Sequence, residues 1–392
     1  MARYKGKIIG LAAMLICTVI LIVVAATLKK NKSDDADNRV SSGTVSSDNK
    51  SYTAYDFAMG TSLSMTVYGD MKSDGSSKAE EECKKVFGLI KKLDEEIISW
   101  RNEDSLISRL NSDGRMEVDS PDQAVLARAI AVSLGICRAS DGALDITLRP
   151  LLDVWRIEDY ADDPESFVVP DKATLLEAAK KTGCDKVTVE LDMSNKKYEP
   201  AENVRSIDLG GKIADLGAVG KGFALDYIYD EYISTGDSPS VVISVGGSIL
   251  VYGNNTKEGN FKIGIRDPEG SVNDMIGVVE LPSGCGKVCI STSGNYEKYI
   301  DKDNVRYHHI IDPSTMYPAD SGLVSVTVVC SDDSVYPKYS GLISDGLSTA
   351  CFIMGKDRSK KLLKEYGAEA VFIDKEGNIT VTDGLKNRFI LY

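Results

Sequence analysis

The chain of 392 residues carries a formal net charge of −13 and is long enough for one large domain or two ordinary domains with a hydrophobic core. The first 30 residues hold five basic side chains and no acidic one, so the rest of the chain has a net charge of −18. Residues 31–392 are therefore expected to repel nucleic acid, which excludes a general polyanion-binding function. Any phosphate must be bound locally, by backbone N–H groups, a few cations or a metal.

Residues 1–30 predict an N-terminal membrane anchor. The uncharged, mostly apolar run at 8–28 has 21 residues, enough for a helix to span a hydrocarbon core of about 30 Å. A cleaved signal peptide is the alternative, and the length of the run favours a retained anchor. Residues 31–52 are rich in Ser, Asp and Asn and predict a polar tether. We therefore expect a domain at 53–392 that is held outside the cytoplasmic membrane.

Strand and helix patterns follow without a second linker. Leu63, Met65 and Val67 alternate and predict a strand, whereas the apolar residues of 83–97 recur at helical spacing. Pro121 sits where a second long helix can begin.

The later part of the chain mixes both kinds of element. A short apolar strand is expected before Pro150, and a helix is expected over 224–232. Four β-rich runs come next, and between the last two the stretch SDGLSTACFIMG predicts a helix with Asp345 near its first turn. Because helices and strands do not alternate strictly, the pattern predicts an α+β fold, a single mixed domain, rather than a doubly wound sheet.

Eight cysteines show no metal-binding spacing, since no CxxC pair exists. One of them, Cys17, lies in the apolar N-terminal run. The odd number that remains favours free, mostly buried thiols over a disulfide framework.

The stretch DLGAVGKGFALD at 215–226 places three glycines around Lys221. Its order is the reverse of the dinucleotide fingerprint, and the Walker pattern fails because Gly222 stands where Ser or Thr should ligate magnesium. A glycine-rich turn that merely caps a helix is the alternative. Free N–H groups at a helix N-terminus beside a lysine nevertheless suit a phosphate, and Asp215 is placed to accept hydrogen bonds from a ring or an amide.

Two further stretches carry chemistry. Asp345 and Thr349 are four residues apart, so both lie on one face of the predicted helix and offer hard oxygen ligands for Mg²⁺; an N-cap beside a solvated threonine is the alternative. The only histidines are His308 and His309. On a strand they face opposite ways, so at most one points into a given site, and two surface histidines remain the alternative.

Eight stretches taken together resemble one family, the FAD:protein FMN transferases, also called ApbE-type flavin transferases. In family order they are MGT (59–61), SWRNEDSLISRLN (99–111), GALDITLRPLLDVW (142–155), DLGAVGKGFALD (215–226), SVGGSI (244–249), ISTSGNYEKY (290–299), HIIDPSTMYP (309–318) and SDGLSTA (344–350). Each is weak alone, but the ordered set covers nearly the whole body. Three residues depart from the family pattern. Glycine is usual at the position of Met316, tyrosine is common at that of Trp100, and alanine is frequent at that of Gly220.

The resemblance implies an activity and a set of site residues. FMN would move from FAD, the substrate, to a Ser or Thr hydroxyl of a partner protein through a phosphoester bond, with Mg²⁺ as the cofactor and AMP released. The positions that match the family's flavin contacts are Met59, Trp100, Ala143, Leu144, Asp145, Asp215, Lys221 and Ile311. The positions that match its magnesium ligands are Ala218, through its carbonyl, Asp345 and Thr349, and its histidine matches His309, the best candidate for the general base.

Two other functions use the same residue pattern. A Mg-dependent FAD pyrophosphatase needs the same metal and the same phosphate cradle, with water in place of the protein hydroxyl. A membrane-tethered flavin-binding protein without catalysis needs no metal, and the Asp345/Thr349 pair speaks against it. The partner expected for the transferase is an extracytoplasmic electron-transfer flavoprotein subunit.

Overall fold

An antiparallel sheet of nine strands forms the centre of the described chain, which in this computed structural model comprises residues 41–392 apart from 161–162, 193–199, 236–238, 258 and 272. In spatial order the strands are β1 (Ser41–Val45), β2 (Ser51–Ala58), β3 (Thr61–Tyr68), β7 (Ser240–Val245), β8 (Ser248–Gly253), β11 (Cys285–Gly294), β14 (Leu323–Ser331), β15 (Glu369–Asp374) and β16 (Ile379–Val381). The predicted alternation holds in β3, where Leu63, Met65 and Val67 are buried.

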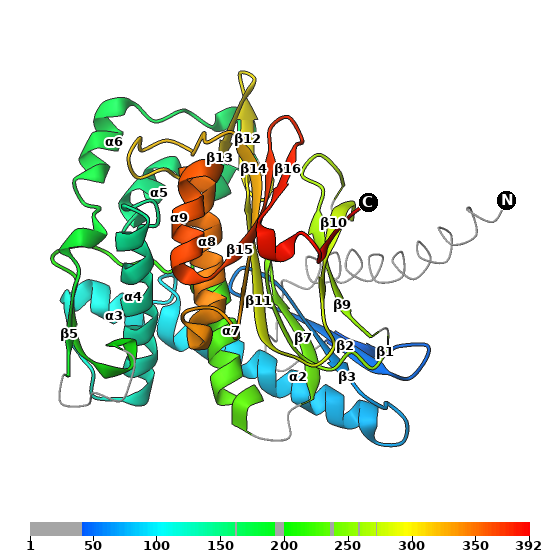
Figure 1. Ribbon diagram of the computed structural model, residues 1–392. Coiled ribbons are helices and arrows are strands. Elements are labelled where there is room, and N and C mark those ends of the chain that lie inside the picture. The colour runs from blue at the N-terminus through cyan, green and yellow to red at the C-terminus, as the bar shows by residue number, and fades with distance from the viewer. Residues whose placement is uncertain (1–40, 161–162, 193–199, 236–238, 258, 272) are drawn as a thin grey trace.

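Helices cover one face of this sheet (Figure 1). They are α2 (Gly75–Lys92), α4 (Pro121–Ala139), α7 (Gly220–Glu231), α8 (Ser340–Met354) and α9 (Lys356–Tyr366). Helix α2 packs on β2 and β3, and α8 packs on β11 and β14 while it also contacts α7 and α4. Helix α8 is therefore held between the sheet and the outer helix α4, and α7 packs beside it.

A small second sheet packs on the opposite face of the large one. It consists of β9 (Phe261–Arg266), β10 (Met275–Leu281) and β17 (Phe389–Leu391), which Figure 1 shows on the side away from the helices. Phe261 and Val279 of the small sheet join Val251 and Val371 of the large sheet in one buried apolar cluster. The arrangement is an α+β fold, as the pattern of elements predicts.

The remaining elements surround the helical layer. They are a single turn of π-helix at Leu93–Ile98, α3 (Leu106–Asp113), a three-stranded sheet of β4 (Arg115–Glu117), β6 (Val204–Asp208) and β5 (Thr188–Leu191), the helices α5 (Arg149–Trp155) and α6 (Lys172–Ala179), and the hairpin β12 (Tyr299–Lys302) and β13 (Val305–His308). Trp155 stacks with Phe167 and Tyr307. These rings pack α5 against the hairpin, whose second strand ends at His308.

Two long helices form where their apolar spacing predicts them. Helix α2 buries Cys83, Val86, Phe87 and Ile90 on one face, and the helical path continues through the π-turn to Ile98. Helix α4 begins at Pro121 as expected, because Ser120 caps it by accepting a hydrogen bond from the Gln123 N–H. A proline at the first helical position costs no hydrogen bond, since that N–H has no partner within the helix.

Three expectations are corrected by the structure. The sheet begins at Ser41, inside the segment 31–52 expected as tether, because β1 pairs with β2 and the Tyr52 ring packs on the bare backbone of Gly43. The apolar stretch before Pro150 is not a strand but a series of turns that leads into α5. Helix α8 begins at Ser340, so Asp345 lies in its second turn rather than near its first.

The described helices do not include one that is both long and apolar enough to cross a bilayer. The anchor predicted for residues 1–30 lies outside the described residues.

Candidate active site

Helices α7 and α8 cross at a contact between two glycines. A Cβ added to Gly222 would lie 2.1 Å from the Gly341 carbonyl oxygen and 2.6 Å from Asp345 Cβ, and one added to Gly341 would lie 2.2 Å from the Gly222 carbonyl oxygen. Backbone therefore meets backbone at this crossing. The close approach lets the Gly222 N–H donate a 2.8 Å hydrogen bond to Asp345 Oδ2, which joins the glycine-rich turn to the predicted metal-binding face.

The start of α8 is anchored by the last residue of the same motif. The Asp226 carboxylate accepts hydrogen bonds from the Gly341 and Leu342 N–H groups at 2.8 and 2.7 Å. Lys287 Nζ lies 2.6 Å from Asp226 Oδ1, and both side chains are buried. Burial lowers the pKa of Lys287, but the charge of Asp226, its hydrogen bond and the smaller influences of Cys289 and Asp230 together outweigh burial and hold that pKa above its usual value. This ion pair fixes where α8 begins, and hence where Asp345 lies.

Two of the predicted metal ligands, Asp345 and Thr349, lie one turn apart on α8 near this crossing. Asp345 is only 4% exposed, and while Oδ2 accepts from Gly222, Oδ1 has no hydrogen-bond partner among the described residues. Thr349 follows one turn later, and its Oγ1 lies 3.2 Å from Ser293 Oγ. Gly346 lies against Val219, since an added Cβ would be 3.2 Å from Val219 Cγ1. Ala218, the residue before Val219, therefore lies in a turn that packs on the Asp345 segment of α8.

This donor set fits magnesium that is shared with a substrate. Mg²⁺ is commonly bound by one or two carboxylates together with substrate phosphates and waters. The described residues hold no cluster of three or more His, Cys, Asp and Glu side chains that would make an all-protein metal cage. One carboxylate with a free oxygen, one hydroxyl and one backbone carbonyl match the first kind of site.

Asp215 opens the glycine-rich turn and is 8% exposed. Its Oδ1 accepts a 2.8 Å hydrogen bond from the Gly217 N–H, and its own N–H donates to the Ile146 carbonyl. Burial raises the pKa of Asp215, and the opposing influences are the Gly217 N–H and the guanidinium groups of Arg149 and Arg101. Asp215 is thus tied by its backbone to the loop that carries Ala143, Leu144 and Asp145, while its side chain faces two cations.

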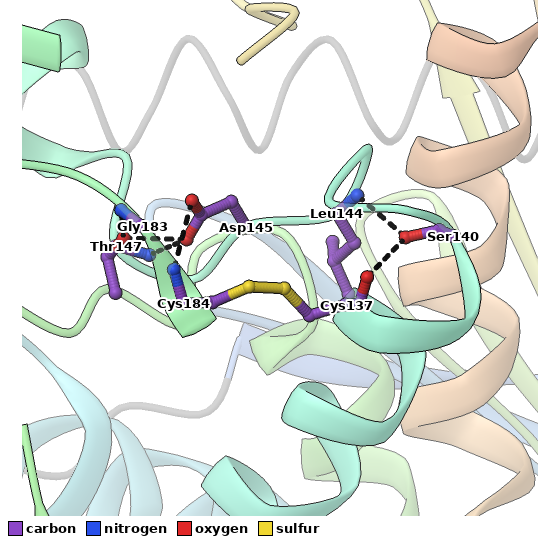
Figure 2. Close-up of a disulfide and its surroundings, with 7 residues drawn as sticks. All are labelled: Cys137, Ser140, Leu144, Asp145, Thr147, Gly183 and Cys184. Atoms are coloured by element: carbon purple, nitrogen blue, oxygen red, sulfur yellow. Dashed lines mark hydrogen bonds between the residues drawn. A yellow bond between two sulfur atoms is a disulfide. The ribbon is translucent and has the colours of Figure 1, made fainter. Parts of the chain in front are cut away.

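The loop that carries Ala143, Leu144 and Asp145 is braced by a disulfide between Cys137 and Cys184, as Figure 2 shows. Asp145 Oδ1 accepts hydrogen bonds of 2.7 Å from both the N–H and the hydroxyl of Thr147, and its Oδ2 accepts a longer one, 3.4 Å, from the Cys184 N–H. The Asp145 carboxylate therefore holds its own loop against the segment around Cys184.

The disulfide corrects the expectation of free thiols in part. Among the described cysteines, Cys137 and Cys184 are paired, and the other five, Cys83, Cys285, Cys289, Cys330 and Cys351, are free. The two bonded residues are 47 positions apart. An odd count does not exclude one pair, and no local spacing signals a bond between the end of α4 and a distant 3₁₀ turn.

Met59 and Trp100 come from earlier segments of the chain, after β2 and after the π-turn. Met59 has a left-handed backbone with φ of 54°, its N–H donates to Asp94 Oδ2 at 2.7 Å, and its Cε would lie 3.5 Å from a Cβ added to Gly220. Met59 therefore packs at the start of α7. Trp100 follows the π-turn, and the guanidinium carbons of Arg101 and Arg149 lie 4.3 and 3.2 Å from its ring centroid.

The two histidines have different surroundings, but only His308 lies on a strand, because β13 ends at His308 and His309 follows in a bend. His308 is buried, and its Nε2 lies 3.0 Å from the Ala319 carbonyl oxygen. His309 is half-buried, and its Nδ1 lies 3.2 Å from the Lys298 carbonyl oxygen. Burial lowers the pKa of each imidazole to about 4. The positive charges of Lys298 and, more weakly, Lys221 also lower the pKa of His309.

The loop after the histidines takes the shape expected of a glycine-containing turn. Ile311 is buried and bridges to Pro318. Met316 adopts φ of 69°, a left-handed conformation that glycine adopts without strain. Its carbonyl accepts a 2.8 Å hydrogen bond from Trp155 Nε1, and this bond helps to hold the conformation.

Several residues of the site carry no separate signal in the sequence. Asp226 and Gly222 belong to the quoted motif, but their partners on α8 lie 115 and 123 residues away. Lys287 stands in a strand that is otherwise apolar or small, and a lone lysine there is the only hint of a buried ion pair. Arg149 precedes a proline at the start of α5, and nothing in that spacing indicates that its side chain reaches Trp100.

Comparisons with known proteins agree with this architecture. A model of the ApbE family matches residues 59–372. The FAD:protein FMN transferase of Escherichia coli is 29% identical over 302 residues, which cover 77% of this chain and 79% of that protein. The protein of the same name from Treponema pallidum is 30% identical over 353 residues, 86% of this chain and 89% of that protein.

Solved structures show the same fold. The crystal structure of the ApbE protein from Thermotoga maritima, 30% identical, superposes with a TM-score of 0.68 and covers 86% of this chain and 99% of that chain. The flavin transferase ApbE from Vibrio cholerae, 25% identical, gives a TM-score of 0.64 with the same coverage of both chains.

Proposed function

The chain belongs to the ApbE family, and from that premise we propose that it is an FAD:protein FMN transferase that requires magnesium. It takes FMN from FAD, attaches it to a Ser or Thr hydroxyl of a partner protein and releases AMP. The relatives from Escherichia coli and Treponema pallidum carry the name of this activity. The observation that carries the proposal in this chain is the Gly222–Asp345 hydrogen bond, because it unites a phosphate-binding turn with a carboxylate that has an oxygen to spare.

The phosphate groups of FAD are proposed to lie at the start of α7. The N-terminus of this helix offers N–H groups and a partial positive charge, and Lys221 adds a full charge. The Lys221 side chain passes the backbone of Gly246, where an added Cβ would lie 3.4 Å from Lys221 Cδ. A strongly acidic protein thus collects local positive charge at one point, as binding of a dinucleotide requires.

His309 is the proposed general base. Its Nδ1 faces the Lys298 carbonyl, and a protonated Nδ1 that donates there leaves Nε2 unprotonated and able to accept a proton. Because burial lowers the pKa of His309 to about 4, the imidazole is neutral near pH 7. A neutral imidazole is the form that a general base needs.

In the reaction, the oxygen of the acceptor hydroxyl forms a bond to the phosphorus of the FMN half of FAD. The bond from that phosphorus to the bridging oxygen breaks, AMP leaves with the bridging oxygen, and the hydroxyl proton passes to His309. Phosphoryl transfer of this kind depends mainly on positioning and on stabilisation of charge on the phosphate oxygens.

Asp345, Thr349 and the Ala218 carbonyl are the proposed magnesium ligands. Bound there, the ion would neutralise charge that develops on the phosphate oxygens. The residues of the chain prepare this site: Gly222 orients the Asp345 carboxylate, and Ser293 orients the Thr349 hydroxyl.

We propose that the catalytic domain lies outside the cytoplasmic membrane, tethered by residues 1–30, and that its partner is an extracytoplasmic electron-transfer flavoprotein subunit. The Cys137–Cys184 disulfide supports this location, because disulfides persist in oxidising compartments and are rare in the cytosol.

The test is incubation of the full-length protein with FAD, Mg²⁺ and a candidate acceptor, followed by mass spectrometry of the acceptor and measurement of AMP. Transfer makes the acceptor heavier by one FMN less one water for each modified hydroxyl, and one AMP is released for each. AMP and free FMN without a modified acceptor would identify a pyrophosphatase, and bound but unconverted FAD would identify a binding protein.

Two variants test the metal site within this assay. Asp345→Ala is expected to abolish transfer at ordinary magnesium concentrations, because a carboxylate contributes a full charge to the ion. Thr349→Ala is expected to weaken transfer less and to be partly rescued by excess Mg²⁺, since a hydroxyl contributes only a dipole. Full activity of Asp345→Ala after treatment with a chelator would rule out the proposed ligand set.

A further inference from the structure

Arg149, at the start of α5, links two residues of the proposed flavin site. Its Nη1 lies 3.7 Å from Asp215 Oδ2, and its guanidinium carbon lies 3.2 Å from the centroid of the Trp100 ring. Its Nη2 forms an ion pair with Asp153, one helical turn away. We propose that Arg149 is a specificity-determining residue which, together with Asp215, recognises the imide edge of the isoalloxazine ring of FAD. The inference rests on the proposed function, which places a flavin beside Trp100 and Asp215.

The chemistry of the imide edge matches this pair of side chains. The edge presents a carbonyl, an N–H and a second carbonyl, and thus needs one acceptor flanked by donors. An ionised carboxylate only accepts hydrogen bonds, and a guanidinium only donates them, from five N–H groups in a fixed plane. Asp215 can accept from the ring N–H while Arg149 donates to a neighbouring carbonyl. Neither side chain alone can hydrogen-bond to both the N–H and the carbonyl groups of the imide edge.

The positions of the two side chains are already constrained. Asp215 is 8% exposed, and the Gly217 N–H holds its Oδ1. The Arg149 side chain is 22% exposed and is held from three directions, by Asp153, Asp215 and the Trp100 ring. Its ion pairs engage Nη1 and Nη2, and N–H groups remain on the guanidinium for a ligand. A donor fixed in this way loses little conformational entropy when a ring binds.

A purely structural role explains less of this geometry. The Arg149–Asp153 pair is an i,i+4 pair whose aspartate side chain is 53% exposed, and exposed pairs of this kind stabilise a protein only slightly. Such a pair does not require the guanidinium to stack on Trp100 or to approach a buried carboxylate on another segment. Both of these additional contacts are to residues of the proposed flavin site.

The experiment compares ligands that share different parts of FAD. Full-length protein is titrated with FAD and with ADP, which keeps the adenosine and the pyrophosphate but lacks the flavin ring. We expect Arg149→Gln to weaken FAD binding about ten- to a hundredfold, the effect of one lost hydrogen bond from a charged group, and to leave ADP binding within about twofold. Arg156→Gln is the matched control, because Arg156 lies at the end of the same helix and pairs with Asp159 in solvent. It should leave both affinities unchanged.

A modified ligand tests the other half of the pair. FAD methylated at the imide nitrogen lacks the N–H that Asp215 would accept, so the wild-type protein should bind it more weakly than FAD. Equal loss of FAD and ADP affinity in Arg149→Gln would overturn the inference, because the residue would then act on the phosphates or on the fold. Wild-type FAD affinity in Arg149→Gln would also overturn it and would leave the transferase proposal intact. Failure of the wild-type protein to bind FAD at all would overturn both.

Discussion

Replacement of Gly222 by alanine tests whether the contact between α7 and α8 builds the site. The new Cβ would lie 2.1 Å from the Gly341 carbonyl oxygen and 2.6 Å from Asp345 Cβ, distances at which atoms overlap. The two helices must separate, and the Gly222 N–H then moves away from Asp345 Oδ2. We therefore expect Gly222→Ala to lower both the stability of the protein and its affinity for magnesium.

The size of each effect follows from the contacts that are lost. Overpacking of a core by one methyl group costs about 1–3 kcal/mol, and loss of a hydrogen bond to a charged group costs about 1.5–3 kcal/mol. The free energy of unfolding should therefore fall by about 3 kcal/mol or more, a large share of the about 5–15 kcal/mol typical of a domain. Because Gly222 orients a proposed metal ligand, the magnesium concentration for half-maximal FMN transfer should rise about 10- to 100-fold.

The assay combines urea unfolding with magnesium titrations of FMN transfer. Gly88→Ala is the matched control: Gly88 lies on the exposed side of α2, no atom lies within 4 Å of its added Cβ, and its φ is not left-handed. That substitution should leave the magnesium requirement unchanged and stabilise the helix by about 0.5–1 kcal/mol. A Gly222→Ala protein with wild-type stability and a wild-type magnesium requirement would refute the reasoning.

Three other outcomes are expected. His309→Ala should slow FMN transfer about 10²- to 10⁴-fold without loss of FAD binding, whereas His308→Ala should leave the single-turnover rate unchanged; equal losses would contradict the assignment of His309 as the base. Joint replacement of Cys137 and Cys184 by serine should lower the free energy of unfolding by about 4 kcal/mol, as expected for a bond that closes 47 residues, and identical urea midpoints for the oxidised and reduced wild-type protein would argue against a bond in solution. Because burial lowers the pKa of His308 from 6.5 to about 4, the unfolded chain takes up a proton before the folded one does. Stability should therefore decrease as the pH falls from about 6.5 to 4, by roughly 3 kcal/mol from this residue, and His308→Gln should flatten that part of a pH series of unfolding curves.

Elements with a strong apolar period could be predicted from the sequence, and elements set by distant partners could not. The spacing of Leu63, Met65 and Val67 predicts β3, and Pro121 marks the start of α4. By contrast, β1 is polar and is ordered by its pairing with β2, so its composition resembles that of a tether. The turns before Pro150 contain apolar residues because these turns are buried. Their backbone is not that of a strand, so the apolar composition alone predicts the wrong element.

The candidate site shows the same division between local and distant causes. The four-residue spacing of Asp345 and Thr349 correctly places both on one helix, α8. The spacing does not predict where that helix begins, because its cap is not local. The Asp226 carboxylate, on α7, accepts hydrogen bonds from the Gly341 and Leu342 N–H groups. Likewise, the partner of Cys137 is set by tertiary packing, which no cysteine spacing reveals.

Strand β1 limits how far the catalytic domain can stand from a membrane. The sheet starts at Ser41, so with residues 1–30 in the bilayer as proposed, only residues 31–40 connect the two. Ten residues span at most about 35 Å when fully extended, less than half the reach of the 22-residue tether that composition alone predicts. If the proposed anchoring holds, an acceptor protein would have to present its hydroxyl close to the lipid surface, which would favour membrane-bound acceptors over those that diffuse freely.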